Sequence, residues 1–519
     1  MTEPGNVQPE EPVTRRSLRQ GGSGSGASPP AQYTSSQVER VPFDAQAYGA
    51  KPAPSEKRGI AGLIARHPRV WLASALSLSF LVLAMSAFFI GVSAGSQAAV
   101  VMPVPTESAV APRAQPGSIP GATRLRTCSI SGIAADPRLS DFTGYVVNAT
   151  TGELLFDRGG TAPNRTADVL QLITASAAVS VLGADTRLVT KVVAGTTPGT
   201  IVLVGGGDAT LATTTSTFYA GAAQVSDLAA QVNANFRSLN GPTAEITNIV
   251  LDASLWDPSD RWDSTWPERA RTSGSQAQVT ALMVNGDRAD PSQDLSPRST
   301  DPIGNAGAAF ADALGLDSVT FSSGAAVGST VLGQVQSQPI SVLVGQMLLT
   351  GDRALAETLA RLVSKSSGLG GTAASLNQTM TAAMASLDLT VTGLTIRDGS
   401  GLSDANSVSP QFITQLLQKI RANEFNLGIV YAGLPVSAET GDLFDRFSGP
   451  NAVAAGAVIA RPGGIESQRS LAGIVNAPDG TSLAFAFFAS RGGVSRDARD
   501  ALDDITTAVF NCGDGLSNN

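Results

Sequence analysis

The side chains that most often carry enzyme chemistry are scarce in this chain. Its 519 residues include one histidine, His67, and two cysteines, Cys128 and Cys512. His67 stands directly before an apolar run that is long enough to cross a membrane. If that run crosses a membrane, no histidine remains beyond it, which excludes a Ser-His-Asp triad, a Cys-His dyad and a histidine-ligated zinc site there. We expect His67 to be a solvated flanking residue.

The apolar run, residues 70–92, is predicted to be a transmembrane helix. It contains no charged residue, and its length suffices for a hydrocarbon core of about 30 Å. It lies too far from the N-terminus for an ordinary signal peptide. Lysines and arginines precede it, and the first charge after it is Glu107. The positive-inside rule therefore predicts a single-pass protein of the cell membrane, with a cytoplasmic N-terminus and an extracytoplasmic main domain.

The regions on either side of this run are predicted to lack a packed core. Residues 1–69 are rich in Pro, Gly, Ser and Gln, and such a composition buries too little apolar area to offset the entropy lost on ordering. We interpret them as a disordered cytoplasmic tail and residues 93–124 as a Pro/Ala-rich linker. The net charge of −8 argues against a nucleic-acid partner, because phosphate binding needs a basic surface.

The remaining segment alternates between strand and helix patterns. Two β-rich runs around a turn predict a hairpin over 142–159, and an amphipathic helix follows from about Thr166 to Gly183. Further strands are predicted within 187–211, 246–256, 456–475 and 482–491, and helices over 339–365, 409–423 and 495–511. This order indicates one sheet built from both ends of the segment, with helices on its faces.

The two cysteines bracket this segment closely. In an exported domain the expected arrangement is one disulfide, Cys128–Cys512, which ties the first and last segments together. Residues 513–519 are predicted to be a short tail.

Five stretches of the segment resemble, in order, sequences typical of low-molecular-mass penicillin-binding proteins of the D-alanyl-D-alanine carboxypeptidase/endopeptidase family, which are serine peptidases. They are VLVGGGDATL (202–211), TALMVNGD (280–287), IRDGSGLS (396–403), GLPVSAETGDLFDRF (433–447) and SLAGIV (470–475). The resemblance implies an α/β fold of the α+β type, the penicillin-binding-protein transpeptidase/β-lactamase-like fold, with an antiparallel sheet flanked by helices. It implies a carboxypeptidase-like domain over 125–188 plus 292–512, an inserted β-rich subdomain over 189–291, and neither a cofactor nor a metal.

The resemblance also implies three catalytic motifs. In S-x-x-K, a serine nucleophile and a lysine base lie one helical turn apart. S-x-N shuttles the proton and holds the substrate, and K-T-G binds the substrate's terminal carboxylate. The first motif aligns with the turn before LITASAAVSVLG, where Asp168 occupies the serine position and Gln171 the lysine position.

The other two motifs are replaced as well. The second aligns with Gly351 and Arg353 in place of its serine and asparagine, and the third with Arg461-Pro462-Gly463 in place of K-T-G. A shifted alignment is excluded by a scan of the chain. Every lysine has leucine, tyrosine or proline three positions before it, so no S-x-x-K exists, and neither K-T-G nor K-S-G occurs.

These replacements predict that catalysis is lost while a binding site can remain. Asp168 is a poor nucleophile toward an amide, and Gln171 has no proton to exchange. Arg353 and Arg461 can grip a peptide carboxylate through a bidentate fork, and either can pair with Asp168. The backbone N–H groups of Asp168 and Gly464 can still form an oxyanion-hole-like pair. Arg353, Arg461 and Gly464 are therefore the candidate ligand-binding residues.

Three interpretations stay open at this point. The favoured one is a pseudoenzyme of the cell envelope that binds a peptidoglycan stem peptide or a partner protein. The second is an active serine-type D-Ala-D-Ala carboxypeptidase/endopeptidase. The third is a purely structural envelope protein, in which the replaced side chains only fill a closed cleft and muropeptides do not bind.

Overall fold

The computed structural model of the chain describes residues 125–490 and 497–518. The predicted cytoplasmic tail, the predicted transmembrane helix 70–92 and the whole of the predicted linker lie outside these residues. Within the two described ranges, every helix is too short or too polar to span a bilayer.

A five-stranded antiparallel sheet is built from both ends of the described chain, as the sequence predicted. In spatial order its strands are β3 (Leu154–Arg158), β2 (Asp141–Asn148), β11 (Ser482–Ser490), β10 (Gln468–Asn476) and β9 (Val458–Ile465). β11 lies in the centre and is buried on both faces, which explains its continuous apolar sequence. β9 is an edge strand, so one side of its backbone faces away from the sheet.

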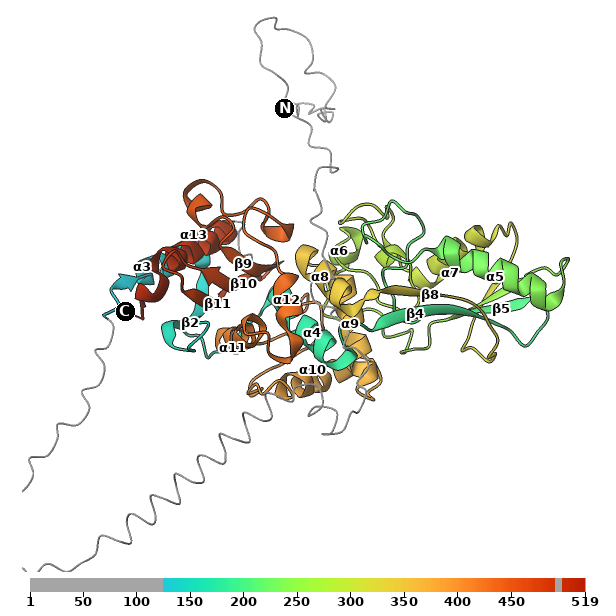
Figure 1. The fold of residues 1–519 in the computed structure, drawn as a ribbon, viewed down its shortest axis with the longest axis horizontal. Coiled ribbons are helices and arrows are strands. Elements are labelled where there is room, and N and C mark those ends of the chain that lie inside the picture. The colour runs from blue at the N-terminus through green and yellow to red at the C-terminus, as the bar shows by residue number, and fades with distance from the viewer. Residues whose placement is uncertain (1–124, 491–496, 519) are drawn as a thin grey trace, which may run out of the picture. The chain divides into compact units, whose positions relative to one another are not determined.

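Different helices cover the two faces of this sheet (Figure 1). α13 (Asp497–Cys512) forms one core with the sheet through Leu502, Ile505 and Val509, which pack with Phe485 and Phe487. A layer of helices forms the second core on the other face. Its helices are α4 (Gln171–Ala177), α8 (Ile340–Thr350), α9 (Arg353–Ser366), α10 (Leu376–Ala385), α11 (Pro410–Arg421) and α12 (Gly428–Ala432).

A second sheet of five strands has a core of its own. In spatial order the strands are β7 (Thr320–Ser323), β6 (Asn248–Asp252), β5 (Thr200–Val204), β4 (Arg187–Ala194) and β8 (Val331–Pro339). Helices α5 (Val225–Asn240) and α7 (Pro302–Leu314) cover one face (Figure 1). These elements span residues 187–339, whereas the predicted inserted subdomain covers 189–291. All four residues of β7 are exposed and β8 carries several polar residues, so neither shows the apolar pattern of a strand in the sequence.

The helix predicted over 339–365 is in fact two helices. α8 ends at Thr350, and the next residue, Gly351, adopts the left-handed conformation with φ of 67°. Asp352 is the N-cap of α9, and its side chain accepts a hydrogen bond from the Leu355 N–H at 3.0 Å. Apolar residues continue at helical spacing across this break, so periodicity alone did not reveal it.

The predicted disulfide between Cys128 and Cys512 is confirmed, with the two Cα atoms 5.5 Å apart. Next to it, β1 (Cys128–Ser129) pairs in parallel with β12 (Leu516–Ser517). Part of the segment predicted as a tail, 513–519, therefore belongs to the fold. A two-residue strand is too short to leave a pattern in the sequence.

Candidate functional site

Asp168 lies in the tight 3-10 turn η4 (Ala167–Leu170) that precedes α4. Two glycines from other parts of the chain press against this turn. A Cβ on Gly401 would lie 2.2 Å from the Ala167 carbonyl oxygen, and a Cβ on Gly463 would lie 2.7 Å from the Asp168 nitrogen. Since no real Cβ approaches that closely, both positions require glycine. They bring strand β9 and loop 396–403 against the turn and leave Asp168 only 7% exposed.

The carboxylate of Asp168 is held by Arg353 and by strand β9. Arg353 donates from Nε to Oδ1 at 2.7 Å and from Nη2 to Oδ2 at 3.0 Å. The Gly464 N–H donates to Oδ2 at 3.3 Å, and Arg353 Nη2 also donates to the Gly464 carbonyl oxygen at 2.8 Å. We call these three residues the clasp. Because of the clasp, both the N–H and the C=O of Gly464 are used within the chain.

The two charged side chains of the clasp are largely buried. The side chains of Arg353 and Asp168 are 11% and 10% exposed. Burial by itself lowers the pKa of Arg353, but the charge of Asp168 and its hydrogen bonds outweigh burial and raise that pKa above its ordinary value. The charged form of Arg353 is thus stabilised, and a bidentate pair of this kind is among the stronger polar contacts in proteins.

Gln171, one helical turn after Asp168, is fully buried. Its Nε2 donates to the carbonyl oxygens of Ser400 at 3.2 Å and Gly351 at 3.4 Å. Its Oε1 has no hydrogen-bond partner among the described residues. An amide in this position ties α4 to loop 396–403 and to the end of α8, but it can neither accept nor release a proton near neutral pH.

Arg461 is buried and has partners other than the clasp. Its Nη1 donates to the Leu348 carbonyl at 2.8 Å, and its Nη2 lies 2.7 Å from Asp442 Oδ2. A Cβ on Gly351 would lie 2.0 Å from Arg461 Nη2. The guanidinium therefore occupies the space that a serine side chain at position 351 would need. Gly351, at the second motif position, has no side chain, and Arg461, at the third, fills the volume that this leaves.

Pro462 lies on edge strand β9, opposite Leu471 of β10. A residue without a backbone N–H is tolerated on an edge strand, because a donor that faces away from the sheet has no ladder partner to lose. The fold therefore accommodates proline where the resemblance implies threonine, and the next residue, Gly463, contacts the Asp168 turn as described above.

The structure brings the predicted site residues together around one turn, and Asp168 pairs with Arg353 rather than with Arg461. Sequence reasoning missed Asp442, the ion-pair partner of Arg461. Asp442 lies within the stretch 433–447 that supports the resemblance, but no spacing rule connects it to position 461. Ligand binding by Arg353, Arg461 and Gly464 stays a prediction.

A pocket opens beside the clasp. Its volume is about 200 Å³, or about 550 Å³ when the solvent space at its open mouth is included. Asp168, Gly463 and Gly464 line it together with four arginines and Asp442; the arginines are Arg446, Arg461, Arg469 and Arg499. Positively charged side chains thus outnumber negatively charged ones in the lining, and three of the arginines also have carboxylate partners: Arg446 has Asp503, Arg461 has Asp442, and Arg499 has Asp445 and Asp500.

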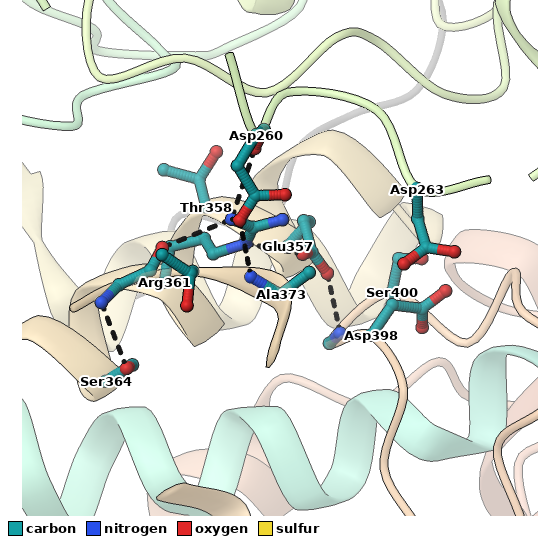
Figure 2. Close-up of polar contacts among 12 residues, drawn as sticks. Asp260, Asp263, Glu357, Thr358, Arg361, Ser364, Ala373, Asp398 and Ser400 are labelled. Carbon is teal, nitrogen blue, oxygen red and sulfur yellow. Dashed lines mark hydrogen bonds and ion pairs between the residues drawn. The ribbon is translucent and has the colours of Figure 1, made fainter. Parts of the chain in front are cut away.

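A buried ion pair holds the loop that supports this site (Figure 2). Glu357 on α9 accepts from Arg361 Nε at 2.8 Å and from the Gly399 N–H at 2.6 Å, and both side chains are fully buried. Burial raises the pKa of Glu357, although Arg361 opposes this. Arg361 also donates to Asp260 Oδ2 at 2.7 Å. The pair therefore links α9 to the loop that contains Asp260 and to the loop that contains Ser400. The carbonyl oxygen of Ser400 accepts the hydrogen bond from Gln171.

The start of α9, which carries Arg353, is anchored by a second buried cluster. Asp352 accepts from the Tyr219 hydroxyl at 2.7 Å and from Arg288 Nη2 at 3.0 Å. Burial alone would raise the pKa of Asp352, but Arg288 and Arg298 outweigh it and lower this pKa to about 2. Asp352 is therefore ionised near neutral pH and holds the first turn of α9 in place.

Comparison with known proteins gives two kinds of match. Residues 127–295 and 287–509 match the sequence profile described as the D-Ala-D-Ala carboxypeptidase 3 (S13) family. Carboxypeptidase DacB of Mycolicibacterium smegmatis is 30% identical over 466 residues, which cover 85% of this chain and 96% of that protein. A carboxypeptidase of Mycobacterium tuberculosis H37Rv is 30% identical over 448 residues, covering 81% of this chain and 92% of that protein.

The fold has a counterpart among solved structures. Penicillin-binding protein 4 (dacB) from Haemophilus influenzae superposes with a TM-score of 0.60 at 16% sequence identity, covering 74% of this chain and 99% of that chain. At this identity the likeness concerns the fold alone, an α/β architecture with several sheets.

Proposed function

Since this chain belongs to the D-Ala-D-Ala carboxypeptidase 3 (S13) family, which acts on peptidoglycan stem peptides, we propose that it is a non-catalytic member that works in the cell envelope by binding. Its ligand would be a peptidoglycan stem peptide or an envelope protein. We further propose that residues 70–92 anchor it in the cell membrane as a single-pass protein, with the described domain outside. The charge distribution around that run supports this orientation.

The clasp is the observation that carries the proposal. At the nucleophile position stands a carboxylate that three internal donors already bind. At the base position stands Gln171, a group that does not titrate. In a serine protease, loss of the nucleophile alone costs about a millionfold in turnover, and here the base is replaced as well. The Gly464 N–H donates to Asp168, so a developing oxyanion would meet an occupied donor and a negative charge.

The support for binding comes from what surrounds the clasp. The pocket beside it is lined by four arginines, and the turn is kept in place by Gly401, Gly463 and the Glu357–Arg361 pair. A well-supported, arginine-rich cleft favours recognition of an acidic or carboxylate-terminated molecule. A purely structural protein would have no need of an open pocket at this place, which is why we rank that alternative below a binding function.

Labelling with a fluorescent penicillin tests the loss of catalysis. The full chain in detergent is incubated with the probe, denatured and separated by electrophoresis, with and without an excess of unlabelled penicillin. We expect no covalent band. A denaturation-resistant band that competes with unlabelled penicillin and maps to one serine of this chain would establish an acylated nucleophile and overturn the proposal in favour of an active serine carboxypeptidase.

Calorimetry with purified muropeptides tests the binding function separately. A saturable heat signal is expected for the full chain, and it should weaken when Arg353 is replaced by glutamine. Absence of any heat signal, together with an unchanged melting temperature at high muropeptide concentration, would instead favour the purely structural alternative.

A further inference from the structure

We propose that the clasp is a carboxylate-binding site that the chain occupies with its own Asp168, and that a carboxylate-terminated peptide can take the same place once Asp168 leaves it. The inference rests on the proposed function, because it assumes that this site binds and does not catalyse. It adds the ligand group that the site recognises and the internal group that competes for it.

The donors of the clasp form a receptor for a carboxylate. Two N–H groups of Arg353 reach the two different oxygens of Asp168, and the Gly464 N–H adds a third hydrogen bond to one of them. This fork geometry matches any carboxylate, including the C-terminus of a peptide. Asp168 contributes only its carboxylate to this arrangement, so the site does not depend on the rest of that residue.

The receptor keeps its shape without Asp168. Arg353 Nη2 donates independently to the Gly464 carbonyl at 2.8 Å, which fixes the guanidinium beside strand β9. Arg353 is the first residue of α9, and Asp352 before it is anchored by Tyr219 and Arg288. Removal of the Asp168 carboxylate therefore leaves a buried guanidinium and a backbone N–H, both positioned and both without their former acceptor.

The carboxylate position borders an open pocket. Asp168, Gly463 and Gly464 line the open pocket, so the carboxylate position and the edge of β9 face the same space. Four arginines and one further aspartate, Asp442, complete the charged lining. The pocket of about 200 Å³ opens to solvent, so the residues that precede a peptide's terminal carboxylate would extend through its mouth.

Competition sets the expected behaviour of the native chain. A site that is filled internally for most of the time binds an external ligand more weakly, in proportion to the fraction of time it is open. If Asp168 occupies the clasp nine-tenths of the time or more, removal of its carboxylate tightens external carboxylate binding by about tenfold or more. The internal carboxylate thus acts as an autoinhibitory ligand.

Acetate tests the receptor, with Asp168→Ala in the full chain as the main variant. The melting temperature and the heat of binding are measured against sodium acetate, with sodium chloride at equal ionic strength and neutral acetamide as references. We expect a saturable rise in melting temperature with acetate for Asp168→Ala, none with acetamide, and a response at least about tenfold weaker in the native chain. Asp168→Ala combined with Arg353→Gln should not respond.

Asp136→Ala is the matched control, because Asp136 also binds one arginine, Arg138, through both oxygens, but at a more exposed place and outside the lining of the pocket. It should show no acetate-specific shift. If Asp168→Ala does not fold, Asp168→Ser takes its place, since serine also leaves the carboxylate position open. N-acetyl-D-alanyl-D-alanine then separates a peptide site from a site for small carboxylates: tighter binding than acetate is expected if the peptide also contacts the β9 edge.

Three results would overturn the inference: no acetate-specific shift in either Asp168 variant, an equal shift in the variant that also lacks Arg353, or a peptide that binds no better than acetate. None of these is confused with failure of the proposed function, because penicillin labelling of the native chain reports an active nucleophile independently of any acetate response.

Discussion

Replacement of Gly351 by serine tests whether the residues at the second and third motif positions interlock. Serine restores the side chain that the family resemblance implies at this position. In this chain its Cβ would lie 2.0 Å from Arg461 Nη2 and 3.0 Å from Asp442 Oδ2. The Arg461 guanidinium would have to move, and its contacts with Leu348 and Asp442 would be lost or distorted.

The expected cost has two parts. A non-glycine residue at the left-handed φ of 67° costs about 1–2 kcal/mol. Removing the partners of a buried charge costs about 3–5 kcal/mol, and the low end applies here because Asp442 is 37% exposed and is solvated when the pair breaks. We therefore expect the free energy of unfolding of Gly351→Ser to fall by about 4–5 kcal/mol in total.

Urea unfolding of the full chain, followed by circular dichroism, measures this cost. Gly315→Ser is the matched control: Gly315 also ends a helix with a left-handed φ, of 74°, but a Cβ there meets no atom within 4 Å. It should lose only the backbone part, about 1–2 kcal/mol. Arg461→Lys should relieve the clash, because a lysine has no second terminal nitrogen at the Nη2 position.

The double variant Gly351→Ser with Arg461→Lys should therefore be more stable than the sum of the single variants predicts, by at least about 1.5 kcal/mol. If Gly351→Ser costs no more than Gly315→Ser, or if the double variant is simply additive, the guanidinium does not fill the serine volume and the reasoning is wrong.

Three further perturbations have expected outcomes. Replacing Cys128 and Cys512 by serine removes a cross-link between residues 384 positions apart. The unfolded chain then gains conformational entropy, so the free energy of unfolding should fall by up to about 6 kcal/mol. An unchanged urea midpoint would contradict this. Asp352 has its pKa lowered from 3.8 to about 2 by two buried arginines, so its stabilisation is complete above about pH 4 and is lost as pH falls toward 2; this loss, about 2.5 kcal/mol, should be absent in Asp352→Asn. Glu357→Ala leaves Arg361 buried without its main partner and should cost about 3–5 kcal/mol by urea unfolding, whereas replacing both residues by leucine should recover most of the loss.

The sequence predicted the larger elements because their patterns are local. The structure contains the predicted hairpin at 142–159, the helix that begins at Ser409 and Pro410, and the closing helix. Alternation, capping and helical periodicity depend on residues that are close in sequence, so the sequence alone reveals them. The break at Gly351 was missed because it needs only a left-handed glycine and a capping aspartate inside an apolar pattern. β7 and β8 were missed because their side chains are exposed or polar and only their backbone pairing makes them strands.

By itself the sequence determined which motifs are absent: residue types at motif spacing are a one-dimensional property, and the absence of any S-x-x-K or K-T-G needs no coordinates. It also indicated that Asp168 would meet an arginine, but it offered two. The tertiary structure decided between them, because the positions of Arg353 and Arg461 depend on the turn at Gly351, on Asp442 and on the close approach of β9 to Asp168. The contacts of Asp168 with Arg353 and Gly464 join residues 185 and 296 positions apart, and residues so distant in sequence become neighbours only when the core has packed.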